Sequence, residues 1–322
     1  MNVKWLRAVL AMAALVAVPG IAAETYPTKP VRILVGAAAG GPLDIIARVV
    51  GQKLSEQLGQ PFVVDARGGA GGIIATKIAA QGGPDGYTLL CNSSQYVVAP
   101  SLYKDPGYDP NKDFAPIVIA GVIPNILFVH PSVPAKNLQE LIALVKARKI
   151  TSYGSAGTGS TPHLTGERLL KSMAGLDITH VPYSGAAPAL TAVTAGQVPL
   201  GVTAMASAMQ LIRAGKLRGI ALTSPQRIPA LADVATVAES GYPGYEDYTW
   251  YAFFAPAGTP KALVDMLNRS IAAILRLPET RERLAVLELG QINNTPEQFA
   301  AYIRVEVTKW AKVIKESGAR VD

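Results

Sequence analysis

The sequence predicts an α/β protein of two hinged lobes, each built on a mostly parallel sheet flanked by helices. Short apolar runs rich in Val and Ile alternate with longer stretches of helical period, a pattern typical of parallel strands that are buried on both faces. Two extended, proline-marked segments, near residues 122 and 250, are placed to cross between lobes. The length of 322 residues fits roughly two domains.

The apolar runs are short enough to be strands, and the stretches between them are long enough to be helices. The predicted strands span residues 31–37, 61–66, 87–93, 125–130, 150–155, 178–183, 198–204, 217–224 and 250–256. Two of the helix starts carry a capping box, in which a side chain before the helix and one three residues later satisfy free N–H groups. Asn137 pairs in this way with Glu140, and Thr295 with Gln298.

The first 23 residues have the pattern of a secretory signal peptide. Lys4 and Arg7 precede an apolar run over residues 8–18, which a Pro-Gly pair and small residues follow. The run is shorter than the roughly 20 residues that span a membrane. We expect export with cleavage near Ala23. In the remaining chain we expect a discontinuous first lobe, residues 24–124 plus 252–322, and a second lobe over residues 125–251.

Charge and cysteine usage exclude several classes of protein. The chain carries 30 basic and 23 acidic residues, net +7, and they are scattered without interleaved aromatic residues. This distribution argues against nucleic-acid binding. Cys91 is the only cysteine, so no internal disulfide can form and the core must stabilise the fold.

Three sites repeat the order strand, glycine turn, helix start. They are GAAAGGPLD at residues 36–44, RGGAGG at 67–72 and YGSAGTGSTPHL at 153–164. The first N–H groups of a helix have no partner within it, and the helix dipole makes that end positive. Such loops bind anions, although glycine also follows strands merely to turn the chain. The third site holds four clustered hydroxyls, at Ser155, Thr158, Ser160 and Thr161, which are more donors than a turn needs.

The third site resembles two catalytic motifs but completes neither. A dinucleotide fingerprint needs a third glycine where Pro162 stands. A nucleophile elbow needs a glycine where Tyr153 stands. The three histidines, His130, His163 and His180, lie at no metal-ligand spacing. We therefore expect no enzyme and no cofactor, with a hydrolase or a dinucleotide enzyme as the remote alternative.

Taken together, these stretches resemble the substrate-binding proteins of tripartite tricarboxylate transporters, the Bug-type periplasmic receptors. The resemblance covers essentially the whole chain after the leader. It rests on YPTKPVRILV, RGGAGG with PDGYTLL, YGSAGTGSTPHL, HVPYSGAAPALTAVTAGQV, AGKLRGIALTS and FFAPAGTP, in that order. It implies a two-lobed, hinged periplasmic-binding-protein-like fold, a periplasmic location, and a cleft for one small organic carboxylate that is delivered to membrane transporter subunits.

The resemblance also implies where the ligand binds. One cleft wall would be the first-lobe loop, the floor would follow the strand at residues 87–93, and the second-lobe loop would hold the ligand carboxylate, largely by backbone N–H groups. The expected ligand-binding residues are Ala39, Gly40, Gly41, Asp44, Ser93, Ser94, Ser155, Ala156, Gly157, Thr158, Ser160, Tyr183 and Thr203. No catalytic residue and no metal ligand is expected.

Two departures from the family pattern bear on the ligand. Ala37-Ala38-Ala39 replaces the proline and aromatic residues usual in the first loop, which makes that wall smaller. Pro199 and Thr203 stand where the family commonly has aspartates that can face an ammonium group. We therefore expect a carboxylate without an amino group, with room for a bulky or aromatic body. We also expect the protein to be a monomer. A receptor that signals to a membrane sensor without transport is the alternative function.

Overall fold

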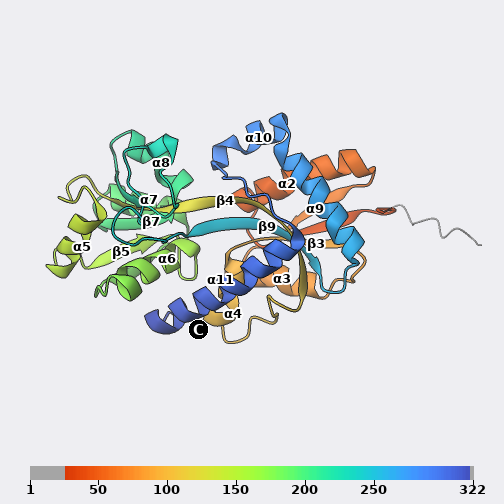
Figure 1. The fold of residues 1–322 in the computed structure, drawn as a ribbon, viewed down its shortest axis with the longest axis horizontal. Helices are drawn as coiled ribbons and strands as arrows, with labels where there is room; N and C mark the ends of the chain where they lie inside the picture. Colours follow the sequence, from red (N-terminus) through yellow and green to blue (C-terminus); the bar gives the residue numbers. More distant parts are fainter. Residues whose placement is uncertain (1–25, 320–322) are drawn as a thin grey trace, which may run out of the picture.

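The computed structural model describes residues 26–319, so the predicted signal peptide lies outside the described residues. Two groups of helices and strands are joined by long strands across the middle (Figure 1). The strands are β1 (Val31–Val35), β2 (Phe62–Ala66), β3 (Thr88–Ser93), β4 (Phe114–Val129), β5 (Ser152–Ser155), β6 (Thr179–Pro182), β7 (Leu200–Ala204), β8 (Arg218–Leu222) and β9 (Tyr248–Pro256).

The helices fill the intervals between strands, and three of them follow β9. They are α2 (Pro42–Leu58), α3 (Ile73–Ala80), α4 (Gln95–Leu102), α5 (Leu138–Lys146), α6 (Thr161–Gly166), α7 (Ala186–Thr194), α8 (Met205–Arg213), α9 (Lys261–Arg276), α10 (Pro278–Leu284) and α11 (Pro296–Ser317). Short 3-10 turns lie at Ala70–Gly72, Pro229–Leu231 and Ala285–Leu287, and a π-helical segment, η2 (Glu167–Met173), continues α6. The capping box at Thr295 and the Asn137 cap are both present. None of the described helices combines the length and apolar character needed to cross a bilayer.

The strands form one nine-stranded sheet, in which eight follow the order β2-β1-β3-β9-β4-β7-β5-β6 and β8 pairs with β4 beside this path. β1 is parallel to β2 and β3, and β5 is parallel to β6 and β7, as the buried apolar runs predict. β4 and β9 run antiparallel to their neighbours. The α/β class is confirmed, and the antiparallel pairs all involve the two strands that join the halves.

β4 is long enough to belong to both halves of the molecule. From Phe114 to Pro124 it pairs with β9, and from Asn125 to Val129 it pairs with β7 and β8. We call β1–β3, β9 and the first part of β4 the first lobe, and β5–β8 with the second part of β4 the second lobe. The polypeptide crosses between them in β4 and again just before Tyr248, close to the two positions that the extended segments suggest.

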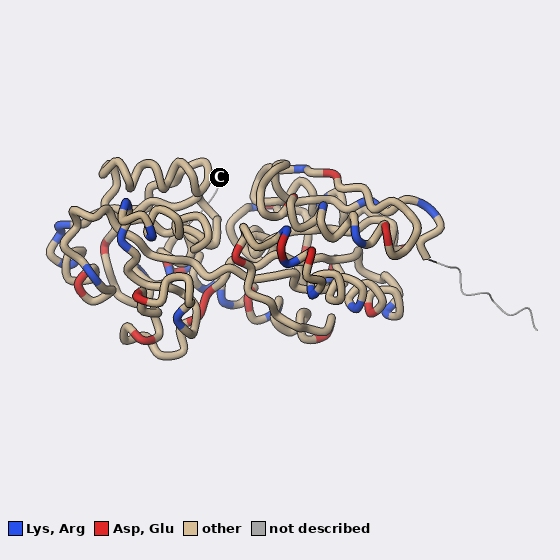
Figure 2. Tube along the Cα trace, turned by 90° about the horizontal axis from the view of Figure 1, so that it is seen from above, with Lys and Arg blue, Asp and Glu red and all other residues tan. Residues whose placement is uncertain are grey.

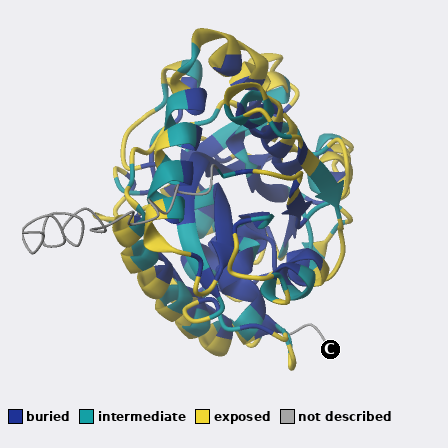
Figure 3. Cartoon of the chain, turned by 90° about the vertical axis from the view of Figure 1, so that its right-hand side faces the viewer, coloured by how far each residue is buried: buried dark blue, intermediate teal, exposed yellow. Residues whose placement is uncertain are grey.

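Each lobe has its apolar core between its sheet and its helices, and the strands are the most buried elements (Figure 3). α11 packs against α4, β4 and η2, so it spans both lobes on one side of the molecule (Figure 1). Cys91 is fully buried, and burial raises the pKa of its thiol. Charged residues are dispersed over both lobes (Figure 2), which agrees with the scattered charge of the sequence.

Candidate functional site

The first-lobe loop turns tightly before α2, and Asp44 holds it. Gly40 has φ +83° and its N–H donates to Asp44 Oδ2 at 2.9 Å. Arg48 Nε donates to the same oxygen at 2.8 Å. The hydrogen bond from Arg48 lowers the pKa of the Asp44 carboxyl. Asp44 is buried, with only 3% of the residue exposed. The side chain of Asp44 thus closes the turn, while Ala39, Gly40 and Gly41 keep some exposure at the start of the helix.

Asn92, which sequence reasoning missed, organises the floor beneath this loop. Its Nδ2 donates to Thr76 Oγ1 at 2.9 Å, and its Oδ1 accepts the Ser93 N–H at 2.7 Å. A Cβ at Gly36 would come within 2.7 Å of Asn92, and one at Gly72 within 2.8 Å. These two glycines therefore leave the space that the buried amide of Asn92 fills. In the sequence, an Asn in an apolar run between glycine turns is the signal that could have identified Asn92.

The second-lobe loop runs from the end of β5 to the start of α6. Ser160 is the N-cap: its Oγ accepts the His163 N–H at 3.3 Å and donates to the Gly157 carbonyl at 2.7 Å. Gly157 has φ +122° and Gly159 φ +78°, both in the region that favours glycine. Thr161, which follows the cap, is the first residue of α6.

The Ser155 side chain lies inside the loop rather than on its surface. Ser155 is fully buried, and its Oγ lies 2.7 Å from His180 Nε2. The same oxygen accepts the Gly157 N–H at 3.3 Å. The hydroxyl also lies 3.4 Å from the Gly157 carbonyl, so its contacts within the described residues are all to the protein, and a direct contact with a ligand stays a prediction.

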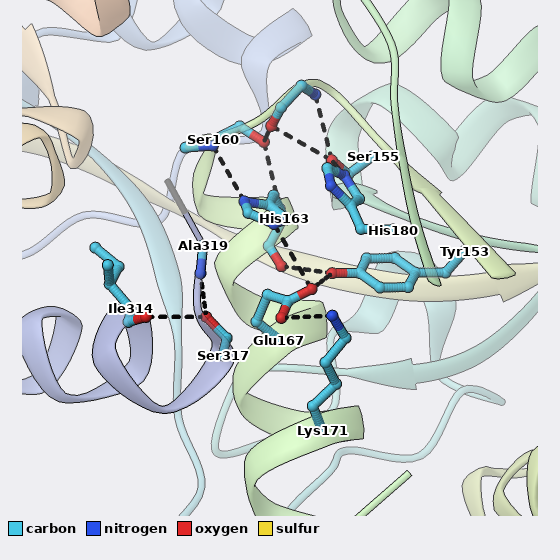
Figure 4. A network of polar contacts seen from close by, with 12 residues as sticks. Tyr153, Ser155, Ser160, His163, Glu167, Lys171, His180, Ile314, Ser317 and Ala319 are labelled. Atoms are coloured by element: carbon cyan, nitrogen blue, oxygen red, sulfur yellow. Dashed lines mark hydrogen bonds and ion pairs between the residues drawn. The ribbon is translucent and has the colours of Figure 1, made fainter. Parts of the chain in front are cut away.

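A buried polar cluster supports the loop from below (Figure 4). His163 stacks on His180 with ring centroids 3.9 Å apart, and its Nδ1 accepts the Gly159 N–H at 3.1 Å. Glu167 accepts the Tyr153 hydroxyl at 2.7 Å and pairs with Lys171 at 2.9 Å. Both histidines therefore support the loop, and the contribution of His180 was not predicted from the sequence.

The titration of this cluster follows from its burial and its contacts. Burial alone would raise the pKa of Glu167, but hydrogen bonds from His163, Tyr153 and Lys171 outweigh it and lower the pKa to about 2. Burial and the nearby His163 lower the pKa of His180 to about 3. At neutral pH the loop therefore rests on an ionised Glu167 and a neutral His180.

The two lobes meet where α4 and α6 begin. Ser94, the N-cap residue of α4, lies with its Oγ 2.5 Å from Thr161 Oγ1, on the first residue of α6. A Cβ at Gly159 would come within 2.3 Å of the Leu102 side chain on α4. The structure thus brings predicted residues of both lobes, Ser94 and the 155–160 loop, into one region.

Tyr183 and Thr203 complete the second-lobe set. The Tyr183 N–H donates to the Ser155 carbonyl at 3.1 Å, and its half-buried ring lies over Gly154. Thr203 is fully buried and its hydroxyl donates to the Ala204 carbonyl at 3.2 Å. The Thr203 hydroxyl is therefore engaged with the backbone, whereas Tyr183 lies at the edge of the loop.

Some donors in these loops have no partner within the part of the chain that is described. They include the N–H groups of Ala156 and Thr158, and the half-buried hydroxyl of Ser93. Thr158 is exposed and Ala156 partly so. An anion placed at the start of α6 could accept from them without displacing a protein contact.

A cavity of about 780 Å³ lies elsewhere between the lobes. Met205 and Ser224–Ile228 line it from the second lobe, and Arg281, Leu284 and Glu288–Ile292 from the first. None of the predicted ligand residues lines it. The helix-start loops are the stronger candidate for an anion site because they hold uncommitted N–H donors. In the cavity, Arg227 is paired with Glu239, and Arg281 donates to Gln291 at 3.1 Å.

Comparison with known proteins places this geometry in context. The family model described as the tripartite tricarboxylate transporter family receptor matches residues 46–319. Protein BugT of Bordetella pertussis is 35% identical over 328 residues, covering 100% of both chains. The structure of R. palustris Rpa4515 with adipate is 36% identical, with TM-score 0.78, covering 91% of this chain and 98% of that one. MatC from Rhodopseudomonas palustris with bound malate is 31% identical, with TM-score 0.76, covering 90% and 100%.

Proposed function

The chain belongs to the tripartite tricarboxylate transporter receptor family, and we propose that it captures a small organic carboxylate between its lobes and delivers it to a membrane transporter. The observation that carries this proposal is the contact between Ser94 at the start of α4 and Thr161 at the start of α6, which joins the two lobes next to the glycine loop of residues 155–160. Two similar proteins have structures with adipate and with malate, which are both carboxylates.

The carboxylate would sit on the second-lobe loop. The N–H groups of Ala156 and Thr158 are its donors, and the positive end of the helix formed by α6 and η2 stabilises its charge. Tyr183 and the exposed Ala39 of the first-lobe loop would border it. Ser155 and Asp44 act through the loops that they hold rather than by direct contact with the ligand.

Closure of the lobes would remove water from the bound anion and strengthen these hydrogen bonds. We place the hinge at Pro124 in β4 and just before Tyr248 in β9, where β4 exchanges β9 for β7 and β8 as its partners. On this basis the lobes would comprise residues 24–124 plus 248–322, and 125–247, which moves the second boundary by four residues from the predicted bounds of 24–124 plus 252–322 and 125–251. The protein would act as a periplasmic monomer after removal of its leader near Ala23.

The expected ligand lacks an amino group. Of the proposed ligand residues only Asp44 carries a carboxylate, and its charge is already paired with Arg48 through Oδ2, which also accepts the Gly40 N–H. An ammonium group bound here would therefore lose its water without gaining a counter-charge. The alanines of the first loop leave space for a longer or wider apolar body.

Titration calorimetry with adipate, malate, succinate, citrate, benzoate, aspartate and glutamate tests the proposal. We expect at least one acid without an amino group to bind, and aspartate and glutamate to bind more weakly. Absence of binding by every acid would contradict the carboxylate site. Tighter binding of aspartate or glutamate would contradict only the specificity.

The chemical state of the ligand after binding tests the proposal that the protein binds the acid without catalysing a reaction. Ser155 is buried and its hydroxyl is engaged with His180, which leaves it poorly placed to attack a bound acyl group. Native mass spectrometry before and after incubation should recover the acid unchanged. Delivery to a transporter, as opposed to signalling, is tested by uptake of the bound acid in cells with and without the protein.

A further inference from the structure

Asp247 is a buried carboxylate at the crossing that leads into β9. Only 1% of the residue is exposed. Its Oδ2 accepts the Thr165 hydroxyl at 2.6 Å, while its backbone N–H and carbonyl bond to Thr223 at 3.0 and 2.6 Å. Its Oδ1 has no hydrogen-bond donor among the described residues. A half-satisfied buried carboxylate is costly, so its presence needs a physical reason.

Thr165 links this crossing to the ligand loop and to the other crossing strand. It is fully buried on α6, the helix whose first turn follows the 155–160 loop. Asn125 of β4 donates its Nδ2 to Thr165 Oγ1 at 2.9 Å and accepts the Thr249 hydroxyl at 3.2 Å. One hydroxyl on α6 is therefore held by both segments that join the lobes.

α11 faces Asp247 from the other side. Lys309 Nζ lies 3.8 Å from Asp247 Oδ1 and also pairs with the buried Glu306. The Oε2 atom of Glu306 accepts the indole N–H groups of Trp310 at 3.0 Å and Trp250 at 3.5 Å. This network runs from α11, through the crossing, to α6, and so connects a helix that follows β9 to the helix that carries the ligand loop.

We propose that Asp247 is a positioning residue that holds α6, and with it the carboxylate-binding loop, at a fixed orientation to the hinge. The proposal rests on the ligand site proposed above and adds the element that sets its geometry. Buried hydrogen bonds of this kind adopt discrete arrangements rather than deforming gradually. They can therefore transmit a movement of the lobes to the ligand loop. Without the Asp247–Thr165 contact, α6 would be held to the crossings by Asn125 and by packing alone.

The charge of Asp247 is sensitive to pH in the range where the protein can be studied. Burial raises the pKa of Asp247 to about 6; Lys309, the Thr165 hydroxyl and Arg168 oppose this effect and Glu306 adds to it. The Tyr245 hydroxyl is close by, and burial raises its pKa well above the usual value. Protonation of Asp247 as the pH falls through 6 weakens its acceptance from Thr165, so ligand affinity should fall with it.

Two matched substitutions and a control test the role of Asp247. Asp247→Asn keeps the shape and removes the charge, and Thr165→Val removes the hydroxyl. Glu246→Gln removes the same charge from the adjacent exposed residue, whose side chain has no partner among the described residues. Hydrogen exchange of residues 155–166 without ligand, and calorimetry with adipate, malate and benzoate at pH 7.5 and 5.5, are the readouts.

We expect Asp247→Asn and Thr165→Val each to speed exchange in residues 155–166 and to weaken binding at pH 7.5 by about five-fold or more. The double variant should be no weaker than the worse single one, and Asp247→Asn should lose much of the pH dependence of the wild type. Glu246→Gln should match the wild type. If Asp247→Asn does not fold, Thr165→Val provides both readouts.

Unchanged exchange together with unchanged affinity and pH profile in these variants would overturn the proposal. If the wild type binds none of the acids, the proposed function fails, but the exchange experiment still decides whether Asp247 holds α6. A uniform loss of stability with normal exchange in residues 155–166 would also overturn the positioning role.

Discussion

The Nδ1 atom of His163 accepts a hydrogen bond from the Gly159 N–H at 3.1 Å. The neutral ring must therefore carry its proton on Nε2, which faces Glu167 at 3.6 Å. A side chain in the first turn of α6 thus fixes the backbone of the loop that precedes it. The N–H groups of Ala156 and Thr158 in the same loop take no part in this bond, and they have no partner among the described residues.

Replacement of His163 by Phe should damage the loop while keeping the ring volume. The buried Gly159 N–H loses its acceptor, which costs about 1–3 kcal/mol in the free energy of unfolding. We expect a weaker ligand affinity as the loop relaxes. Chemical denaturation and calorimetry measure the two effects. His130→Phe, at a site outside the loop, is the control; equal effects from the two substitutions would contradict the role of His163.

Substitution of Gly157 by Ala should be more harmful than the same change at Gly175. At Gly157 a Cβ would lie 2.9 Å from the Tyr183 carbonyl in a backbone of φ +122°, whereas at Gly175 nothing lies within 4 Å. The strain at Gly157 should cost about 1–3 kcal/mol and displace the loop. Affinity should fall in Gly157→Ala only. Identical denaturation and binding curves for the two variants would show that the close approach is unimportant.

The free energy of unfolding should decrease as the pH is lowered, because of His180. The ordinary pKa of 6.5 applies in the unfolded chain, but burial and His163 lower the folded value to about 3. Between these values the unfolded state binds more protons, so the free energy of unfolding decreases as the pH falls from 6.5. His180→Gln should flatten this decline between pH 6.5 and 5, measured by calorimetric melting.

Asp247 has the opposite effect on the free energy of unfolding. Its pKa is raised in the folded state, so a lower pH favours folding at this residue. Both the wild type and His180→Gln carry Asp247, so that contribution is shared in the comparison. Glu167 acts only at lower pH, below about 4.5, where loss of its ionised form removes stability. A His180→Gln slope equal to that of the wild type would mean that His180 titrates normally in the folded protein.

Gly36 and Asn92 should show non-additive effects on stability. A Cβ at Gly36 would lie 2.7 Å from Asn92 Oδ1, so Gly36→Ala should cost about 1–3 kcal/mol by overpacking. Asn92→Ala should also destabilise, because the Ser93 N–H loses its acceptor. The double variant should lose less than the sum of the two, since the smaller side chain makes room. Strict additivity in urea denaturation would contradict this packing.

Local signals in the sequence were sufficient to predict most of the elements, whereas the ligand site stays a prediction. The nine apolar runs all overlap strands, although β4 begins at Phe114 and the predicted run at residues 125–130 covers only its end. The glycine turns at residues 36–44 and 153–164 lead into α2 and α6. The antiparallel direction of β4 and β9 was not predicted, because direction depends on how distant strands pair. The roles of individual side chains were also beyond local patterns: Ser155 and Asp44 face the protein, and His180, 25 residues from Ser155, completes the contact.

The sequence by itself determined the α/β class, the two helix-start loops and the absence of a complete catalytic motif, because periodicity, glycine placement and motif spacing are local properties. Only the tertiary structure decided which side chains support those loops and which donors stay free. It brought Ser94 to Thr161 and Asp247 to Thr165, pairs that are 67 and 82 residues apart. Such contacts arise from the packing of whole elements, since the chain must close long loops before any of these side chains can meet.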